Sequence, residues 1–284
     1  METLKSTCYV FQTDSEIVNK VYQEQDNYLI ETNEKGDKEW CAIYFCSHDI
    51  YYPNIEEIFR KRIIQKNFFE WYHSRITKAS KHIFIRDVFK QWYLAGINKS
   101  INTPEKLTDF LRKETLEYKI VTIGSSAGGY AAILYGSLLS AEYVLAFNAR
   151  FEIYSVLKNS TENINPLAFR LKDQRQKFFD LNPLINDTTK YFYFFSKKSQ
   201  LDIIQKKHLK EKDNIYIICF NTNHHGIPFL KVALPKVVNL NTNKLGEFTK
   251  NSHSPIGFTI QMVGLRRTLS GLIKQIKQAY QKRR

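Results

Sequence analysis

The sequence has few cysteines and no cysteine motif. Its 284 residues include Cys8, Cys41, Cys46 and Cys219, and no two of them have Cys-x-x-Cys spacing. The last three lie in apolar runs, where cysteine usually behaves as a small buried hydrophobic residue. We therefore expect neither a disulfide framework nor a zinc site, and no bound metal.

Targeting and membrane-spanning signals are also missing. The N-terminus, Met-Glu-Thr-Leu-Lys, lacks the apolar core of a signal peptide, and no apolar run approaches transmembrane length. We find no internal repeat, low-complexity linker or recognised nucleic-acid-binding motif. These absences predict a single cytoplasmic domain spanning residues 1–284, without a nucleic-acid partner.

Acidic residues are too few to balance the basic ones. The chain has 28 Asp and Glu against 42 Lys and Arg, which gives a net charge of +14. Such a charge attracts anionic partners, such as a nucleic acid, a membrane surface, a phosphorylated donor or an acidic glycan. A hydrophobic content of 43% and an aromatic content of 14% are typical of a globular protein rather than a disordered one.

The most informative stretch of the chain is Tyr118 to Leu139. A short β-branched apolar run leads into a segment rich in Ala and Leu, as in a strand followed by a helix. A Gly-x-Ser-x-Gly pattern, Gly124 to Gly128, lies between them. In this context the pattern predicts a sharp turn that presents Ser126 as a nucleophile, with glycines where the backbone must approach closely.

A plain glycine-rich turn or a phosphate-binding loop is the alternative interpretation. The sequence has neither a Gly-x-Gly-x-x-Gly fingerprint nor a Gly-Lys-Ser/Thr ending, so phosphate binding has little support. The Ala127 amide, at the start of the following helix, is expected to bind an oxyanion.

Strands and helices alternate from residue 40 onward, which predicts a mainly parallel central sheet with helices on both faces. The sheet segments are apolar runs: Trp40–Cys46, His82–Ile85, the strand before Ser126, Tyr143–Phe147, Tyr191–Phe195 and Asn214–Phe220.

Four weaker local signals complete the strand and helix pattern. Cys8–Phe11 and Tyr28–Glu31 are candidate edge strands. Asn54 is a candidate helix cap, and Thr103-Pro104 opens another helix.

Residues 150–190 interrupt the alternation and are predicted to form an inserted cap over the carboxyl edge of the sheet. The insertion mixes phenylalanines with basic residues: Arg150, Arg170, Lys172, Arg175 and Lys177. A basic cap could bind an anionic substrate, and a solvated helix face explains the same residues equally well.

A serine nucleophile needs an imidazole to accept its proton and a carboxylate to orient that imidazole. On a sheet of this kind the acid and the histidine follow successive late strands, in the order Ser, acid, His. Asp202 and His225 occupy those places. His224 is the alternative base, and Asp187 and Asp213 are alternative acids, although both precede a strand.

The loop after Trp40–Cys46 is expected to supply the second oxyanion donor. In this position the backbone amides of Ser47 and His48 are the candidates. An ordinary connecting loop is the alternative.

The segment from Met262 to Arg284 predicts a basic amphipathic helix. Its apolar face contains Leu269, Leu272, Ile273, Ile276 and Tyr280. Packing on the sheet is one interpretation, and peripheral contact with an anionic membrane is the other.

The segment Gly124–Ala132, together with Asp202 and His225, resembles the serine α/β-hydrolase superfamily. Within it, the chain is similar to divergent members associated with bacterial surface polysaccharides, including capsule O-acetyltransferases. The resemblance covers residues 40–230. The His-Gly-Gly oxyanion motif of esterases is missing.

This resemblance implies an α/β-hydrolase-like fold and transfer of an acetyl group from acetyl-CoA to an anionic glycan. It also implies peripheral contact with the inner membrane or with a capsule-synthesis complex. A carbohydrate esterase or deacetylase with the same triad is one rival. A non-catalytic assembly or secretion partner is the other.

Overall fold

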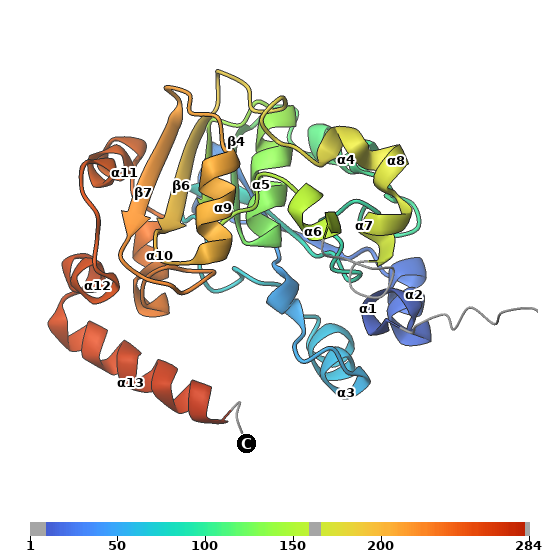
Figure 1. Ribbon diagram of the computed structural model, residues 1–284, viewed down its shortest axis with the longest axis horizontal. Helices are drawn as coiled ribbons and strands as arrows, with labels where there is room; N and C mark the ends of the chain where they lie inside the picture. Colours follow the sequence, from blue (N-terminus) through green and yellow to red (C-terminus); the bar gives the residue numbers. More distant parts are fainter. Residues whose placement is uncertain (1–9, 159–165, 282–284) are drawn as a thin grey trace, which may run out of the picture.

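A computed structural model describes residues 10–158 and 166–281 of the chain (Figure 1). Its centre is a seven-stranded sheet with the strand order β1-β3-β2-β4-β5-β6-β7. Strand β1 runs antiparallel to β3, and all the other neighbours are parallel. The strands are β1 (Tyr28–Thr32), β2 (Asp37–Phe45), β3 (Ala79–Ile85), β4 (Lys119–Ser125), β5 (Tyr143–Phe147), β6 (Lys190–Ser196) and β7 (Ile215–Phe220).

The central strands are buried on both faces, which explains why their sequences are continuous apolar runs. In β2, Cys41, Ile43 and Phe45 belong to one hydrophobic cluster, whereas Ala42 and Tyr44 belong to the cluster on the other face. The mainly parallel sheet predicted from the sequence is confirmed.

Helices cover both faces of this sheet. One face packs against α4 (Pro104–Glu114), α5 (Ala127–Leu138) and α9 (Gln200–His208). The other face packs against α2, the α3 region and the C-terminal helices. The remaining helical segments before residue 100 are α1 (Phe11–Asp14), α2 (Glu16–Glu24), η1 (His48–Ile50), α3 (Glu56–Phe59) and the π-helical η2 (Arg60–Gln65).

Three of the four weaker local predictions can be checked in full. Strand β1 confirms the edge strand at Tyr28, and Thr103 caps α4 by accepting a hydrogen bond from the Lys106 amide at 3.1 Å. The Asn54 prediction was wrong, because Ile55 precedes α3 and the Asn54 side chain accepts a hydrogen bond from Lys90 Nζ at 2.6 Å instead.

The fourth weak prediction, a strand over Cys8–Phe11, was wrong where it can be checked. Phe11 begins α1, and Cys8 lies outside the described residues.

The segment between β5 and β6 contains α6 (Tyr154–Lys158), α7 (Pro166–Arg170), α8 (Lys172–Arg175) and η3 (Gln176–Phe178). It packs beside α5, where the Tyr130 hydroxyl donates to the Phe178 carbonyl at 2.6 Å (Figure 1). A capping role over the sheet edge stays a prediction.

The chain ends in η4 (Lys231–Ala233), α10 (Leu234–Val237), α11 (Thr242–Glu247), η5 (Phe248–Lys250), α12 (Pro255–Val263) and α13 (Leu265–Gln281). Figure 1 shows α13 projecting away from the body of the molecule. Within the described residues, no helix combines the length and the apolar character needed to cross a bilayer.

Candidate active site

Ser126 lies at the turn between β4 and α5, as the Gly-x-Ser-x-Gly pattern predicts. Its backbone has φ 55° and ψ −117°, a conformation that non-glycine residues rarely adopt and that costs about 1–3 kcal/mol. The Ser126 amide donates to the Phe147 carbonyl at 2.9 Å, which fixes the turn against the end of β5.

The two glycines of the pattern are required by close backbone contacts. A Cβ atom on Gly124 would lie 2.0 Å from the Gly128 carbonyl oxygen. A Cβ atom on Gly128 would lie 2.3 Å from the Phe45 carbonyl oxygen at the end of β2. Because neither position carries a side chain, the turn can fold tightly and α5 can start directly after Ser126.

The structure brings Ser126, His225 and Asp202 together from three separate chain segments. His225 Nε2 lies 2.8 Å from Ser126 Oγ, and His225 Nδ1 lies 2.8 Å from Asp202 Oδ1. A carboxylate only accepts hydrogen bonds, so Nδ1 carries the imidazole proton. Nε2 is then left as the acceptor for the Ser126 hydroxyl, the arrangement needed for proton transfer from the serine.

Asp202 is buried, whereas His225 is partly open to solvent. The side chain of Asp202 is 1% exposed and that of His225 is 32% exposed. Asp202 lies in the first turn of α9, rather than in the preceding loop as the sequence suggested, and the helix N-terminus favours its negative charge. Its second oxygen, Oδ2, is buried and has no hydrogen-bond partner among the described residues.

The competing candidates lie elsewhere. The His224 side chain is exposed, and it is His225 that contacts Ser126. Asp187 pairs with Lys212 at 2.9 Å, and Asp213 is exposed just before β7. The geometry therefore groups the Ser126, Asp202 and His225 side chains and none of their alternatives.

A buried asparagine that sequence reasoning missed holds the histidine loop. Asn148 follows β5 and is fully buried. Its Nδ2 donates to the carbonyls of His224 and Gly226 at 3.2 and 2.8 Å, and to Ser196 Oγ at 2.7 Å. Ser196 Oγ also donates to the His224 carbonyl, at 2.7 Å. The backbone on both sides of His225 is thus tied to the ends of β5 and β6.

The loop after β2 differs from expectation in one detail. The Ser47 amide donates to Glu70 Oε2 at 2.6 Å, and the Ser47 hydroxyl donates to Glu70 Oε1 at 2.9 Å. The Ser47 amide is therefore occupied and is withdrawn as an oxyanion donor. No acceptor among the described residues binds the amides of His48 and Ala127. These two amides are the remaining candidates, and Glu70 fixes the loop that carries the first.

Two cations near this loop affect the pKa of His48. Burial, followed by the nearby charges of Lys90 and Arg150, lowers the pKa of His48 to about 3, so its imidazole is neutral at physiological pH. Burial also lowers the pKa of Arg150, against the opposing effect of Glu152 and Asp202. Arg150 is thus a half-buried cation beside the triad.

Three other basic residues of the 150–190 segment bind groups elsewhere in the protein. Arg170 pairs with Asp14 at 3.6 Å, and Lys177 pairs with Glu105 at 2.7 Å. Arg175 donates to the Leu94 carbonyl at 3.3 Å. Arg150 differs from these residues because Asp202 of the triad is among the charges that affect its pKa.

Comparisons with known proteins identify a fold but no family. No family model matches the chain, and no curated protein matches it. Among solved structures, a protein of unknown function from Staphylococcus aureus is 12% identical, with a TM-score of 0.51 over 78% of this chain and 94% of the other.

Two enzymes are also similar in structure. The capsule O-acetyltransferase of Neisseria meningitidis serogroup A is 13% identical, with a TM-score of 0.45 over 65% of this chain and 76% of its own. An esterase/lipase from an uncultured bacterium is 9% identical, with a TM-score of 0.43 over 88% of this chain and 93% of its own. The mainly parallel seven-stranded sheet and the strand–Ser126–helix turn are themselves the α/β-hydrolase type of fold predicted from the sequence. The likeness to the two enzymes adds nothing about activity.

Proposed function

We propose that this protein is an acyltransferase that uses Ser126 as its nucleophile. The observation that carries the proposal is the Ser126–His225–Asp202 relay, with both hydrogen bonds at 2.8 Å, built on a strained turn at the N-terminus of α5. A serine hydroxyl becomes a competent nucleophile when a positioned imidazole accepts its proton.

In the first half-reaction, Ser126 Oγ attacks the acyl carbonyl of a thioester while His225 Nε2 accepts the hydroxyl proton. The amides of Ala127 and His48 stabilise the oxyanion. The carbon–sulfur bond then breaks, His225 returns the proton to the thiol, and an acyl-serine remains. In the second half-reaction, an acceptor hydroxyl gives its proton to His225 and attacks the acyl carbonyl. The bond between the acyl group and Ser126 Oγ then breaks, and His225 returns the proton to Oγ, which restores the free serine.

The donor we propose is acetyl-CoA, and the acceptor is a hydroxyl of a bacterial capsular or other anionic surface polysaccharide. The support for this choice is the resemblance of the Gly124–Ala132 segment to capsule O-acetyltransferases and the net charge of +14. The half-buried Arg150 beside the triad adds a local cation that favours anionic substrates. Both substrates carry negative charge.

The first test is thiol release from acetyl-CoA by the purified protein, with and without a panel of capsular glycans. Release that requires a glycan supports the transferase. Release to water alone identifies an esterase or deacetylase with the same triad. Ser126→Ala should lower either rate by at least about a thousandfold.

A fluorophosphonate label followed by intact-mass measurement tests the nucleophile independently of the substrate. We expect one adduct on the wild type and none on Ser126→Ala. Ser137→Ala is a matched control, because Ser137 is a buried serine of α5 that bonds Tyr191 and lies outside the relay. A folded wild type that resists the label would refute an activated serine and leave the non-catalytic assembly or secretion role.

A further inference from the structure

Helix α13 exposes an apolar stripe that the proposed chemistry does not use. Its members are spaced by four, four and three residues, so they lie along one side of the helix. They are Leu265, Leu269, Ile273 and Ile276, with exposed fractions between 51% and 60%. The stripe overlaps the apolar face predicted from the sequence, but it points to solvent. Exposed apolar surface of this extent marks an interaction site.

A different side of α13 holds the helix to the protein. Thr268 and Gly271 are buried, and a Cβ atom on Gly271 would lie 2.6 Å from Val232 Cγ1. Gln275 Oε1 accepts a hydrogen bond from the Lys231 amide at 2.9 Å. The helix is therefore anchored to η4 by residues outside the stripe, and the stripe stays available.

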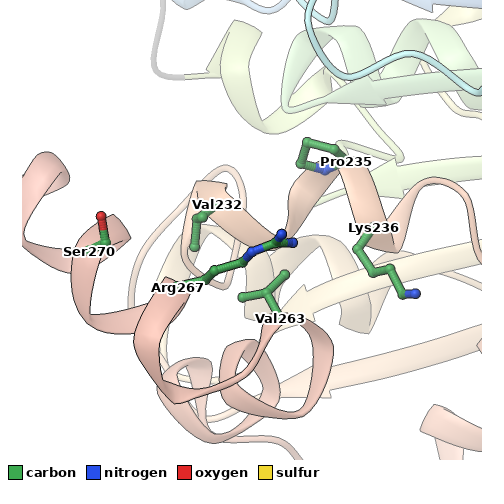
Figure 2. Close-up of a pocket in the computed structure, with 6 residues that line it drawn as sticks. All are labelled: Val232, Pro235, Lys236, Val263, Arg267 and Ser270. Carbon is green, nitrogen blue, oxygen red and sulfur yellow. The ribbon is translucent and has the colours of Figure 1, made fainter.

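Four cations of α13 have no acidic partner among the described residues to neutralise them. At about 3.6 residues per turn, Arg266 and Lys277 flank the stripe, whereas Arg267 and Lys274 lie nearly opposite its centre. Arg266, Arg267, Lys274 and Lys277 are exposed, and none of them forms an ion pair within the part of the chain that the structure describes. The chain has no acidic residue after Glu247. Figure 2 shows Arg267 extending toward α10, where it and Lys236 line a cavity of about 450 Å³ with Val232, Pro235, Val263 and Ser270.

We propose that α13 docks on an anionic lipid bilayer, with its apolar stripe in the acyl-chain boundary and the flanking Arg266 and Lys277 at the headgroups. An apolar stripe on a helix whose charged residues are all basic is the composition of interfacial helices. Anionic headgroups complement that charge. A second copy of this chain would not complement the charge, because pairing through α13 would bring two sets of four cations together.

Vesicle sedimentation with the full-length protein tests this proposal without relying on acyl transfer. We expect the wild type to bind vesicles that contain phosphatidylglycerol and to bind pure phosphatidylcholine weakly. Binding should decrease steeply as salt rises from about 0.1 M to about 1 M, because the Debye length shrinks from about 10 to about 3 Å.

Two double variants separate the contributions of the stripe and the cations. Leu269→Ser with Ile273→Ser, and Arg266→Gln with Lys277→Gln, should each weaken binding by about tenfold or more. Matched controls come from α4 and from Leu116, two residues beyond its end. Leu116→Ser changes an apolar residue that is 80% exposed, and Lys106→Gln with Lys113→Gln removes two exposed cations; both should bind like the wild type.

Thermal unfolding confirms that each variant is folded. A wild type that ignores anionic vesicles overturns the proposal, as does equal binding by all variants. Light scattering tests whether a second copy of the chain occupies the stripe instead. A dimer that dissociates when the stripe is substituted, in a protein that does not bind vesicles, would overturn lipid docking and assign the surface to that second copy.

Discussion

At the scale of single residues, the hydrogen bonds of Asn148 determine where His225 lies. Its side-chain amide holds the carbonyls of His224 and Gly226, the two neighbours of the proposed base. Asn148 itself touches neither Ser126 Oγ nor the imidazole, so it is a positioning residue. Its polar side chain follows a strand, where polar residues are common, and nothing local in the sequence shows a partner 76 residues away.

We expect Asn148→Ala to lower kcat by about tenfold to a hundredfold, because a misplacement near 1 Å costs that much. KM for the acyl donor should change little. The matched control is Asn214→Ala, since Asn214 Nδ2 donates to the carbonyls of Asn186 and Thr189 at the opposite end of the sheet. Both variants lose stability, so rates are compared per folded molecule. Equal kcat values in the two variants would assign Asn148 a purely structural role.

His48 gives a pH dependence that can be measured on the protein alone. In the folded state its pKa is about 3, and burial is the main cause. In the unfolded chain it is about 6.5. Between these values the unfolded state binds more protons, so the contribution of His48 to stability is complete above pH 6.5 and is lost as the pH falls toward 3.

Urea denaturation at about pH 7 and about pH 4.5 tests this expectation. At the lower pH, His48 should account for a loss of about 3 kcal/mol in the free energy of unfolding. His48→Phe keeps the ring packed against Trp92 and removes the titration. The variant should therefore lose less stability than the wild type on acidification, and equal losses would contradict the buried, neutral imidazole.

At the scale of elements, the strand-to-helix turn at Ser126 depends on its glycines. We expect Gly124→Ala to destabilise the protein by about 3 kcal/mol or more, because the added methyl group meets backbone atoms that cannot move aside. Gly246→Ala in α11 is the matched control, with no atom within 4 Å of the new Cβ, and it should be neutral or slightly stabilising. Thermal unfolding measures both, and similar melting temperatures would contradict the tight turn.

The elements that the sequence predicted best are those whose burial produces a recognisable run of apolar residues. Strands of a parallel sheet are covered on both faces, so β2, β4 and β6 are continuous apolar runs. Short N-terminal signals were less reliable. Asparagine is a residue type that often caps helices, but the Asn54 side chain accepts a hydrogen bond from the buried Lys90 instead.

At the scale of the whole molecule, chain order predicted the candidate site, because parallel strands deliver their following loops to one edge. Ser126, Asp202 and His225 each follow such a strand. The supporting contacts of Asn148, Ser196 and Glu70 could not be predicted, because they depend on how loops meet in space. The exposure of the α13 stripe could not be predicted either, since an amphipathic pattern does not say whether its apolar side meets protein or solvent.

The position of α13 has a consequence for how an acceptor would be found. Figure 1 shows this helix beyond the carboxyl ends of β6 and β7, and Ser126 follows the carboxyl end of β4 in the same parallel sheet. An enzyme docked through α13 would thus carry its nucleophile at the same edge of the sheet as the docking helix. Its search for the proposed polysaccharide acceptor at the bilayer surface would then take place in two dimensions, where both partners are confined to one surface.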